Sequence, residues 1–103
     1  MAINLKKTTK KDIAGIKGIR LGVTSAGIKD DATDLLVIVL PDNSNVTGLF
    51  TQNQFCAAPV ILSKDHLAHE DNIRALVINS GCANAGMGQQ GMDDAKTVCK
   101  SLA

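Results

Sequence analysis

The strongest constraint on the fold is a run of six consecutive apolar residues, LLVIVL, at positions 35–40. A continuous, largely β-branched run is typical of a strand covered on both faces, so we expect it at the centre of a sheet. The polar cluster at 41–45 (PDNSN) predicts a turn, and residues 46–50 (VTGLF) predict the returning strand of an antiparallel hairpin. Residues 74–79 (RALVIN) predict a further apolar strand, and residues 19–26 (IRLGVTSA), which a glycine interrupts, predict an irregular or bulged strand.

A short helix is expected in the middle of the chain. Ser63 follows the apolar segment 59–62 (PVIL) and can cap a helix over residues 64–70. Asp65 would then lie in the first turn, where the helix dipole favours a negative charge.

A longer amphipathic helix is expected from Gly91 onward, because apolar residues recur there at steps of three and four. This apolar stripe consists of Met92, Ala95, Val98, Cys99 and Leu102. Asp93 and Asp94 come early and Lys96 and Lys100 come later, an order that suits the helix dipole. Together the segments predict an α/β fold with a mixed or mainly antiparallel sheet packed by helices.

Charge and hydropathy exclude several classes of partner. Eleven basic and ten acidic residues give a net charge of +1, with no basic stripe beyond Lys6, Lys7, Lys10 and Lys11, so we expect no nucleic-acid or membrane partner. These lysines precede no apolar segment of a signal peptide, and no run approaches the roughly 18 residues of a membrane span. We therefore expect an ordinary soluble N-terminus and a cytoplasmic protein.

The segment GMGQQG at positions 86–91 matches the Gly-x-Gly-x-x-Gly pattern of phosphate-binding turns. In a dinucleotide-binding unit the first glycine directly follows a strand, whereas six residues separate Gly86 from the strand that ends at Asn79. A phosphate- or nucleotide-binding module that uses Gly86 to Gly91 therefore remains only an alternative. The favoured interpretation is a glycine-rich loop in which the backbone packs tightly before a helix.

Metal-binding and nucleophilic residues occur in weak patterns. His66 and His69 would share a helix face, but a third ligand is not evident, so we expect a solvated face. The acidic turn at Asp30, Asp31 and Asp34 lacks the spacing of a calcium loop.

The three cysteines, Cys56, Cys82 and Cys99, are odd in number and lack metal-ligand spacing, which indicates free thiols in a reducing cytoplasm. Cys82, just ahead of a helix N-terminus, is the best candidate for a reactive thiol, although we favour a packing role.

Four stretches of the chain carry a family resemblance. They are residues 26–29 (AGIK) leading to 34–38 (DLLVI), 48–53 (GLFTQN), 55–60 (FCAAPV), and 74–85 (RALVINSGCANA) followed by 88–95 (GQQGMDDA). In this order they closely resemble the N-terminal part of the ornithine acetyltransferases, the bifunctional glutamate N-acetyltransferases of arginine biosynthesis. The common family form has Asn in place of Cys82 and Thr in place of Met87, and neither position carries the family's assigned chemistry.

The resemblance implies a DmpA/ArgJ-like fold and a self-cleaving precursor of α and β chains. In this family an internal threonine, freed by the cleavage, takes the acetyl group from N-acetylornithine and passes it to glutamate, and some members also use acetyl-CoA. A Thr-Gly pair in a Ser-Thr-Gly-Val-Ile-Gly-like segment forms the oxyanion hole.

Neither motif occurs here. The threonines that fail to match them are Thr8, Thr9, Thr24, Thr33, Thr47, Thr51 and Thr97. We therefore carry over no catalytic, cofactor-binding or metal-binding residue, and we expect this chain to be inactive alone.

The last helix predicts that the chain is incomplete. Its apolar stripe runs through Leu102 with no Gly, Asn or Pro after it to end the helix. We expect residues 1–103 to be a single incomplete domain, the front of the α chain, with the rest of the α chain and the β chain as partners. Open sheet edges and the open face of this helix should also favour an oligomer. A non-enzymatic interaction domain is the other alternative.

Overall fold

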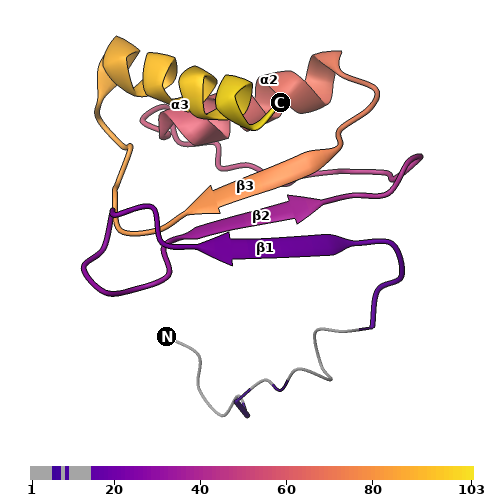
Figure 1. Ribbon diagram of the computed structural model, residues 1–103. Coiled ribbons are helices and arrows are strands. Elements are labelled where there is room, and N and C mark those ends of the chain that lie inside the picture. Colours follow the sequence, from indigo (N-terminus) through magenta and orange to yellow (C-terminus); the bar gives the residue numbers. More distant parts are fainter. Residues whose placement is uncertain (1–5, 8, 10–14) are drawn as a thin grey trace.

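The computed structural model describes residues 6, 7, 9 and 15–103, so that part of the lysine-rich start, including Lys10 and Lys11, lies outside the described residues. The elements are β1 (Arg20–Thr24), β2 (Leu35–Val39), α2 (Ala58–His69), β3 (Ala75–Asn79) and α3 (Gly88–Leu102). The three strands form one antiparallel sheet in the order β1-β2-β3, and Figure 1 shows both helices on the same side of it, next to β3. The predicted α/β class and the central place of the 35–40 run are confirmed.

The two faces of the sheet differ in what covers them. Successive side chains of a strand point to opposite faces, and paired residues share a face. Val77 lies on the face toward the helices, because it lines a pocket together with residues of α2 and α3. The opposite face carries two apolar rows, Val23–Leu36–Ile78 and Leu21–Ile38–Leu76. In β1 and β3 these apolar side chains are exposed, so the residues that the structure describes leave one face of the sheet open.

The 35–40 run is therefore not covered on both faces as its composition predicts. Every residue of β2 is half-buried. The open face explains the difference, because the helices cover only the other one.

The hairpin predicted from residues 46–50 is wrong. These residues lie in an irregular segment between β2 and α2, and Leu49 there is exposed. Both edges of β2 are already paired, with β1 on one side and β3 on the other, so no edge is left for a returning strand. The strand predicted within residues 19–26 is confirmed as β1, but it is neither irregular nor bulged, because pairing continues without interruption from Arg20↔Val39 to Thr24↔Leu35.

The helices begin earlier than the sequence predicts. Helix α2 begins at Ala58 with Pro59 in its first turn, a place where the missing N–H of proline costs nothing. Ser63 is therefore an internal residue and not a cap, and Asp65 lies beyond the first turn. Helix α3 begins at Gly88, three residues before the predicted start at Gly91, so Asp93 and Asp94 also lie beyond its first turn.

The core of this chain is small. Among the described residues, the buried apolar side chains are Ala58 and Leu62, both on α2, each with 7% of its surface exposed. Gly91 of α3 is also buried. The helices thus pack against each other and lie over β3, as Figure 1 shows, while many large apolar side chains among the described residues stay exposed.

Candidate functional site

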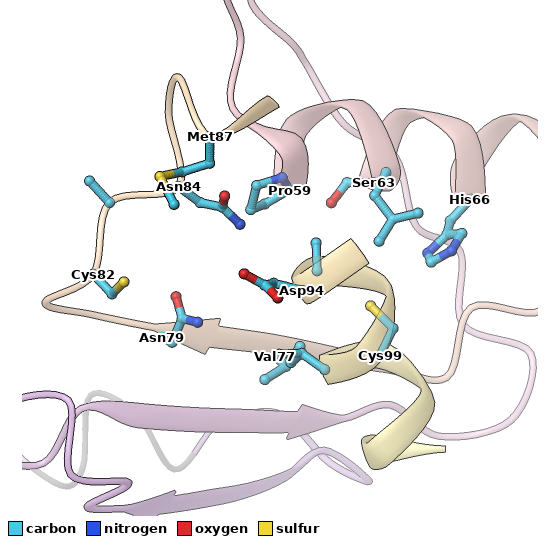
Figure 2. A pocket seen from close by; sticks show the side chains of 14 residues that line it. Pro59, Ser63, His66, Val77, Asn79, Cys82, Asn84, Met87, Asp94 and Cys99 are labelled. Carbon is cyan, nitrogen blue, oxygen red and sulfur yellow. The ribbon is translucent and has the colours of Figure 1, made fainter. Parts of the chain in front are cut away.

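A pocket of about 230 Å³ lies between the two helices, β3 and the loop that joins β3 to α3. Its lining residues are Pro59, Leu62, Ser63, His66, Val77, Asn79, Cys82, Ala83, Asn84, Met87, Asp94, Ala95, Val98 and Cys99. Most of this lining is apolar. Four polar residues, Asn79, Cys82, Asn84 and Asp94, lie toward one end, which we call the polar end, whereas Ser63 and His66 line the pocket from α2. Figure 2 shows the Asp94 carboxylate pointing toward the side where Asn79, Cys82 and Asn84 lie. One Asp94 oxygen accepts a hydrogen bond from Gln90 Nε2 at 2.8 Å.

Residues 80–87, which we call the 80–87 loop, contribute Cys82 and Asn84 to the polar end of the pocket. The loop follows β3 directly and ends where α3 begins. Gly81 and Gly86 have φ angles of 103° and 72°, which glycine adopts without the strain that a side chain would add. The loop can therefore turn sharply between strand and helix.

The segment GMGQQG lies at the entry to α3. The side-chain amide of Asn84 donates a hydrogen bond to the carbonyl oxygen of Gly91 at 3.2 Å. A Cβ atom on Gly91 would overlap the Asn84 side-chain oxygen and would lie 2.7 Å from Met87 Cβ. Tight packing is thus observed at Gly91, whereas nothing lies within 4 Å of a Cβ placed on Gly86 or Gly88.

Asp34 is the most highly connected polar residue near this loop. Only 3% of its surface is exposed, and its carboxylate accepts hydrogen bonds from three backbone N–H groups: those of Ala26 at 2.6 Å, Ile28 at 2.7 Å and Lys29 at 2.9 Å. These bonds, above all that from Ala26, hold the pKa of Asp34 below its ordinary value, because they stabilise the charged form more than burial disfavours it. The backbone carbonyl of Asp34 also accepts a hydrogen bond from the N–H of Ser80, the first residue of the 80–87 loop, at 2.9 Å.

The sequence does not reveal this role of Asp34. It predicts a polar turn for all three aspartates, and Asp30 and Asp31 are indeed exposed turn residues. The available indication was the position of Asp34, directly before a strand and a few residues after Gly27, where a short carboxylate can reach back to the backbone of a turn.

The two histidines occupy different environments. His69 is exposed, and its Nδ1 lies 3.1 Å from Asp65 Oδ1, as expected for a solvated helix face. His66, by contrast, is half-buried and lines the pocket. Within the part of the chain that the structure describes, no group of three or more His, Cys, Asp and Glu side chains is placed to hold a metal ion.

All three cysteines are free thiols, as the sequence indicates. Cys82 is exposed and Cys99 is half-buried, and both line the pocket from opposite sides, on the loop and on α3. The exposure of Cys82 leaves it little part in packing within this chain. No helix among the described residues has the length and apolar character needed to cross a membrane.

A model of the ArgJ family matches residues 20–103, which include the whole sheet, both helices and the pocket. The chain belongs to this family, and the resemblance to the ornithine acetyltransferases is confirmed. The chain is 49% identical to the arginine biosynthesis bifunctional protein ArgJ of Neisseria gonorrhoeae and 48% identical to that of Colwellia psychrerythraea. All of this chain aligns in both cases, but it covers 26% and 27% of those proteins, so it spans about a quarter of the length of these relatives.

Two crystal structures share the fold. One is the arginine biosynthesis bifunctional protein ArgJ from Bacillus halodurans, with a TM-score of 0.73 and 34% identity. The other is an ornithine acetyltransferase complexed with ornithine, from Mycobacterium tuberculosis, with a TM-score of 0.72 and 36% identity. Each similarity covers 79% of this chain and 42% of the other.

Proposed function

We propose that this chain is the N-terminal part of the α chain of an enzyme that transfers an acetyl group from N-acetylornithine to glutamate in arginine biosynthesis. The observation that carries the proposal is the alignment of the entire chain, at 49% identity, with a bifunctional protein of that pathway. In the proposed reaction a threonine hydroxyl attacks the acetyl carbonyl, ornithine leaves as the free amine, and an acetyl-threonine ester remains. The amino group of glutamate then attacks this ester, which regenerates the hydroxyl.

The threonine nucleophile and the oxyanion-hole segment lie, in this proposal, in the part of the protein beyond residues 1–103. None of the threonines in this chain matches either family motif. The role of this chain is then to build the sheet and helices on which the 80–87 loop is carried, close to the acetyl-transfer site. The complete protein uses no bound cofactor, although acetyl-CoA can serve as a second acetyl donor, and it functions in the reducing cytoplasm.

The open face of the sheet supports a larger assembly. Leu21, Val23, Leu76 and Ile78 are exposed on it in two adjoining rows with Leu36 and Ile38. An apolar surface this continuous is usually covered, and sheets of this kind pack face to face about 10 Å apart. We propose that the remainder of the polypeptide, its α and β portions, covers this face, and that the assembled enzyme is an oligomer.

The test compares the complete gene product with the 103-residue chain. Each is incubated with N-acetylornithine and glutamate, and the release of ornithine and N-acetylglutamate is followed by mass spectrometry. We expect transfer by the complete protein, self-cleavage into two chains, an acetyl group on the new N-terminal threonine after acid quenching, and no transfer by the short chain. A parallel reaction with acetyl-CoA shows whether that donor is used.

Two results would contradict the proposal. One is a complete protein that cleaves itself but transfers no acetyl group from N-acetylornithine. The other is transfer by the 103-residue chain at a rate comparable to that of the complete protein, which would place catalytic residues inside this chain. Saturable stabilisation by ATP, NAD or FAD would instead favour a nucleotide-binding module at Gly86 to Gly91.

A further inference from the structure

One residue joins the ends of all three strands next to the pocket. The N–H of Asp34 donates to the carbonyl of Thr24 at the end of β1, at 3.2 Å, and the carbonyl of Asp34 accepts from Ser80 just after β3. Asp34 itself directly precedes β2. The backbone of Asp34 thus fixes the point at which the 80–87 loop leaves the sheet.

The side chain of Asp34 adds a second connection, through the ten-residue connection between β1 and β2 (residues 25–34). Its carboxylate binds the N–H groups of Ala26, Ile28 and Lys29, which holds this segment in a compact turn. This compact segment also packs on the 80–87 loop. A Cβ atom placed on Gly81 would lie 2.7 Å from Lys29 Cγ and 3.3 Å from Ile28 Cγ2, so these two side chains lie directly over the Gly81 backbone.

The chemistry of Asp34 suits this task better than that of its neighbours. A carboxylate is the one short side chain that can accept three N–H hydrogen bonds without offering a competing donor. Asp30 and Asp31, in the same connection, are exposed, whereas Asp34 is buried and fully engaged. Burying a carboxylate costs free energy, which its hydrogen bonds must offset. A buried carboxylate with this many partners therefore indicates that the geometry it imposes on the backbone matters.

We propose that Asp34 is a positioning residue that sets the conformation of the 80–87 loop, both directly through Ser80 and indirectly through the turn that packs on Gly81. It acts on the reaction only through this loop, which carries Asn84 and Cys82 to the polar end of the pocket. The consequence for acetyl transfer rests on the proposed function, because it requires the 80–87 loop to lie beside the acetyl-transfer site.

The test measures the loop itself. Asp34→Asn is made in the complete gene product, and amide hydrogen exchange is followed by mass spectrometry for peptides that cover the whole chain. The carboxylate oxygens now accept hydrogen bonds from backbone N–H groups. In asparagine an NH₂ group replaces one of these oxygens and would face an N–H donor that it cannot accept from, so the turn should open. We expect exchange to accelerate on the order of tenfold in peptides from residues 25–34 and 80–87, with little change at the opposite end of the sheet.

The matched control is Asp42→Asn, which makes the same chemical change at the opposite end of β2. It should leave exchange in the 80–87 loop unchanged. The proposal is overturned if Asp34→Asn leaves the loop as protected as in the unmodified protein. It is also overturned if exchange rises uniformly over all peptides, because Asp34 would then support the fold as a whole and not this loop.

A second variant addresses the case in which Asp34→Asn fails to fold. Lys29→Ala shortens an exposed side chain that packs over Gly81 and keeps every hydrogen bond of Asp34. We expect a smaller acceleration of exchange, roughly two- to threefold, confined to the 80–87 loop. If this loop were unaffected, the packing of the turn on Gly81 would not position it, and the indirect connection would be refuted.

Kinetics separate this proposal from the proposed function. For folded Asp34→Asn we expect kcat for acetyl transfer to fall on the order of tenfold while KM for glutamate changes much less, because a displaced loop misaligns bound substrate. A loosened loop with unchanged kcat would keep Asp34 as the positioning residue and would remove the loop from the acetyl-transfer site. If the unmodified protein transfers no acetyl group, the exchange measurement alone still decides the role of Asp34.

Discussion

The two ends of the central strand β2 each carry an aspartate, and the two aspartates are held in opposite ways. At one end Asp34 has 3% of its surface exposed, and its carboxylate accepts hydrogen bonds from three backbone N–H groups. At the other end Asp42 has a side chain that is 76% exposed, and its Oδ1 lies 2.7 Å from the Nη1 of Arg74, whose side chain is 51% exposed. The same carboxylate therefore organises the backbone at one end and forms a solvated ion pair at the other.

The buried aspartate is the one at the end of β2 nearer the pocket. The Asp34 end is the end from which the 80–87 loop leaves β3, whereas the Asp42 end leads into the long irregular segment before α2. Each hydrogen bond at the Asp34 end contributes to stability, because a buried carboxylate that loses an N–H partner gains no hydrogen bond from water in its place. Solvent and salt weaken the attraction at the other end. We infer that the Asp34 end of β2, beside the candidate site, tolerates substitution poorly, and that the Asp42 end tolerates it well.

Neutralising each aspartate should give the largest difference between the two ends of β2. Asp34→Asn should lower the apparent Tm of the complete gene product by roughly 3–8 °C, since a buried network loses its acceptor. Asp42→Asn should change it by about 1 °C or less. Differential scanning fluorimetry at pH 7 measures both. Equal shifts would mean that burial does not distinguish the two ends.

The charge of Asp34 can be tested through pH. Its folded-state pKa is held below the ordinary aspartate value near 3.9, first by the Ala26 N–H and then by those of Lys29 and Ile28. A depressed folded pKa contributes stability that is complete above the unfolded pKa and is lost as the pH falls through the folded pKa. The stability difference between the unmodified protein and Asp34→Asn should therefore be constant from about pH 5 to 7 and should shrink below about pH 4.

Urea unfolding midpoints at a series of pH values provide that measurement. A difference that stays constant down to the acid limit of folding would show that the shape of the side chain matters and its charge does not. The hydrogen-bond geometry at Ala26, Ile28 and Lys29 would then need another explanation.

A pair of glycines tests whether the two ends differ in backbone as well as charge. Gly81, beside the Asp34 end, has φ of 103°, and Gly18, beside Pro41 at the Asp42 end, has φ of 88°. Alanine at either position should destabilise the fold by about 1–2 kcal/mol, because L-residues are strained at positive φ. The added Cβ would meet Lys29 Cγ at 2.7 Å in one case and Pro41 Cβ at 3.2 Å in the other.

Chemical unfolding gives the two free energies, and hydrogen exchange locates the effect. Gly81→Ala should loosen the 80–87 loop and Gly18→Ala should not. If Gly18→Ala loosened that loop equally, the two ends of the sheet would be coupled, and the 80–87 loop would not be controlled from the Asp34 end alone.

Local features of the chain could be predicted from sequence. The apolar runs of β2 and β3 and the apolar period of α3 each carry enough of their own pattern to identify the element and its type. The family could also be inferred, because its motifs lie in continuous stretches such as residues 74–85. In these cases neighbouring residues determine the result.

Features that depend on distant residues could not be predicted. Residues 46–50 have strand-like composition, but β1 and β3 occupy both edges of β2, and sequence composition does not tell which candidate strand pairs. The pocket gathers side chains from α2, β3, the 80–87 loop and α3. The sequence alone does not distinguish Asp34 from Asp30 and Asp31, because its hydrogen bond with Ser80 depends on the fold.

The ion pair between Asp42 and Arg74 should contribute least to stability, and its strength tests whether this end of β2 is held only weakly. A double-mutant cycle with Asp42→Asn, Arg74→Gln and both together isolates their interaction, which we expect to be about 0.2–1 kcal/mol. Screening should reduce it further between about 0.05 M and 0.5 M salt, because both side chains are largely exposed. A coupling of several kcal/mol, or one insensitive to salt, would mean that this end is also rigidly organised. The contrast with Asp34 would then reflect which groups each carboxylate binds, and burial would not be its cause.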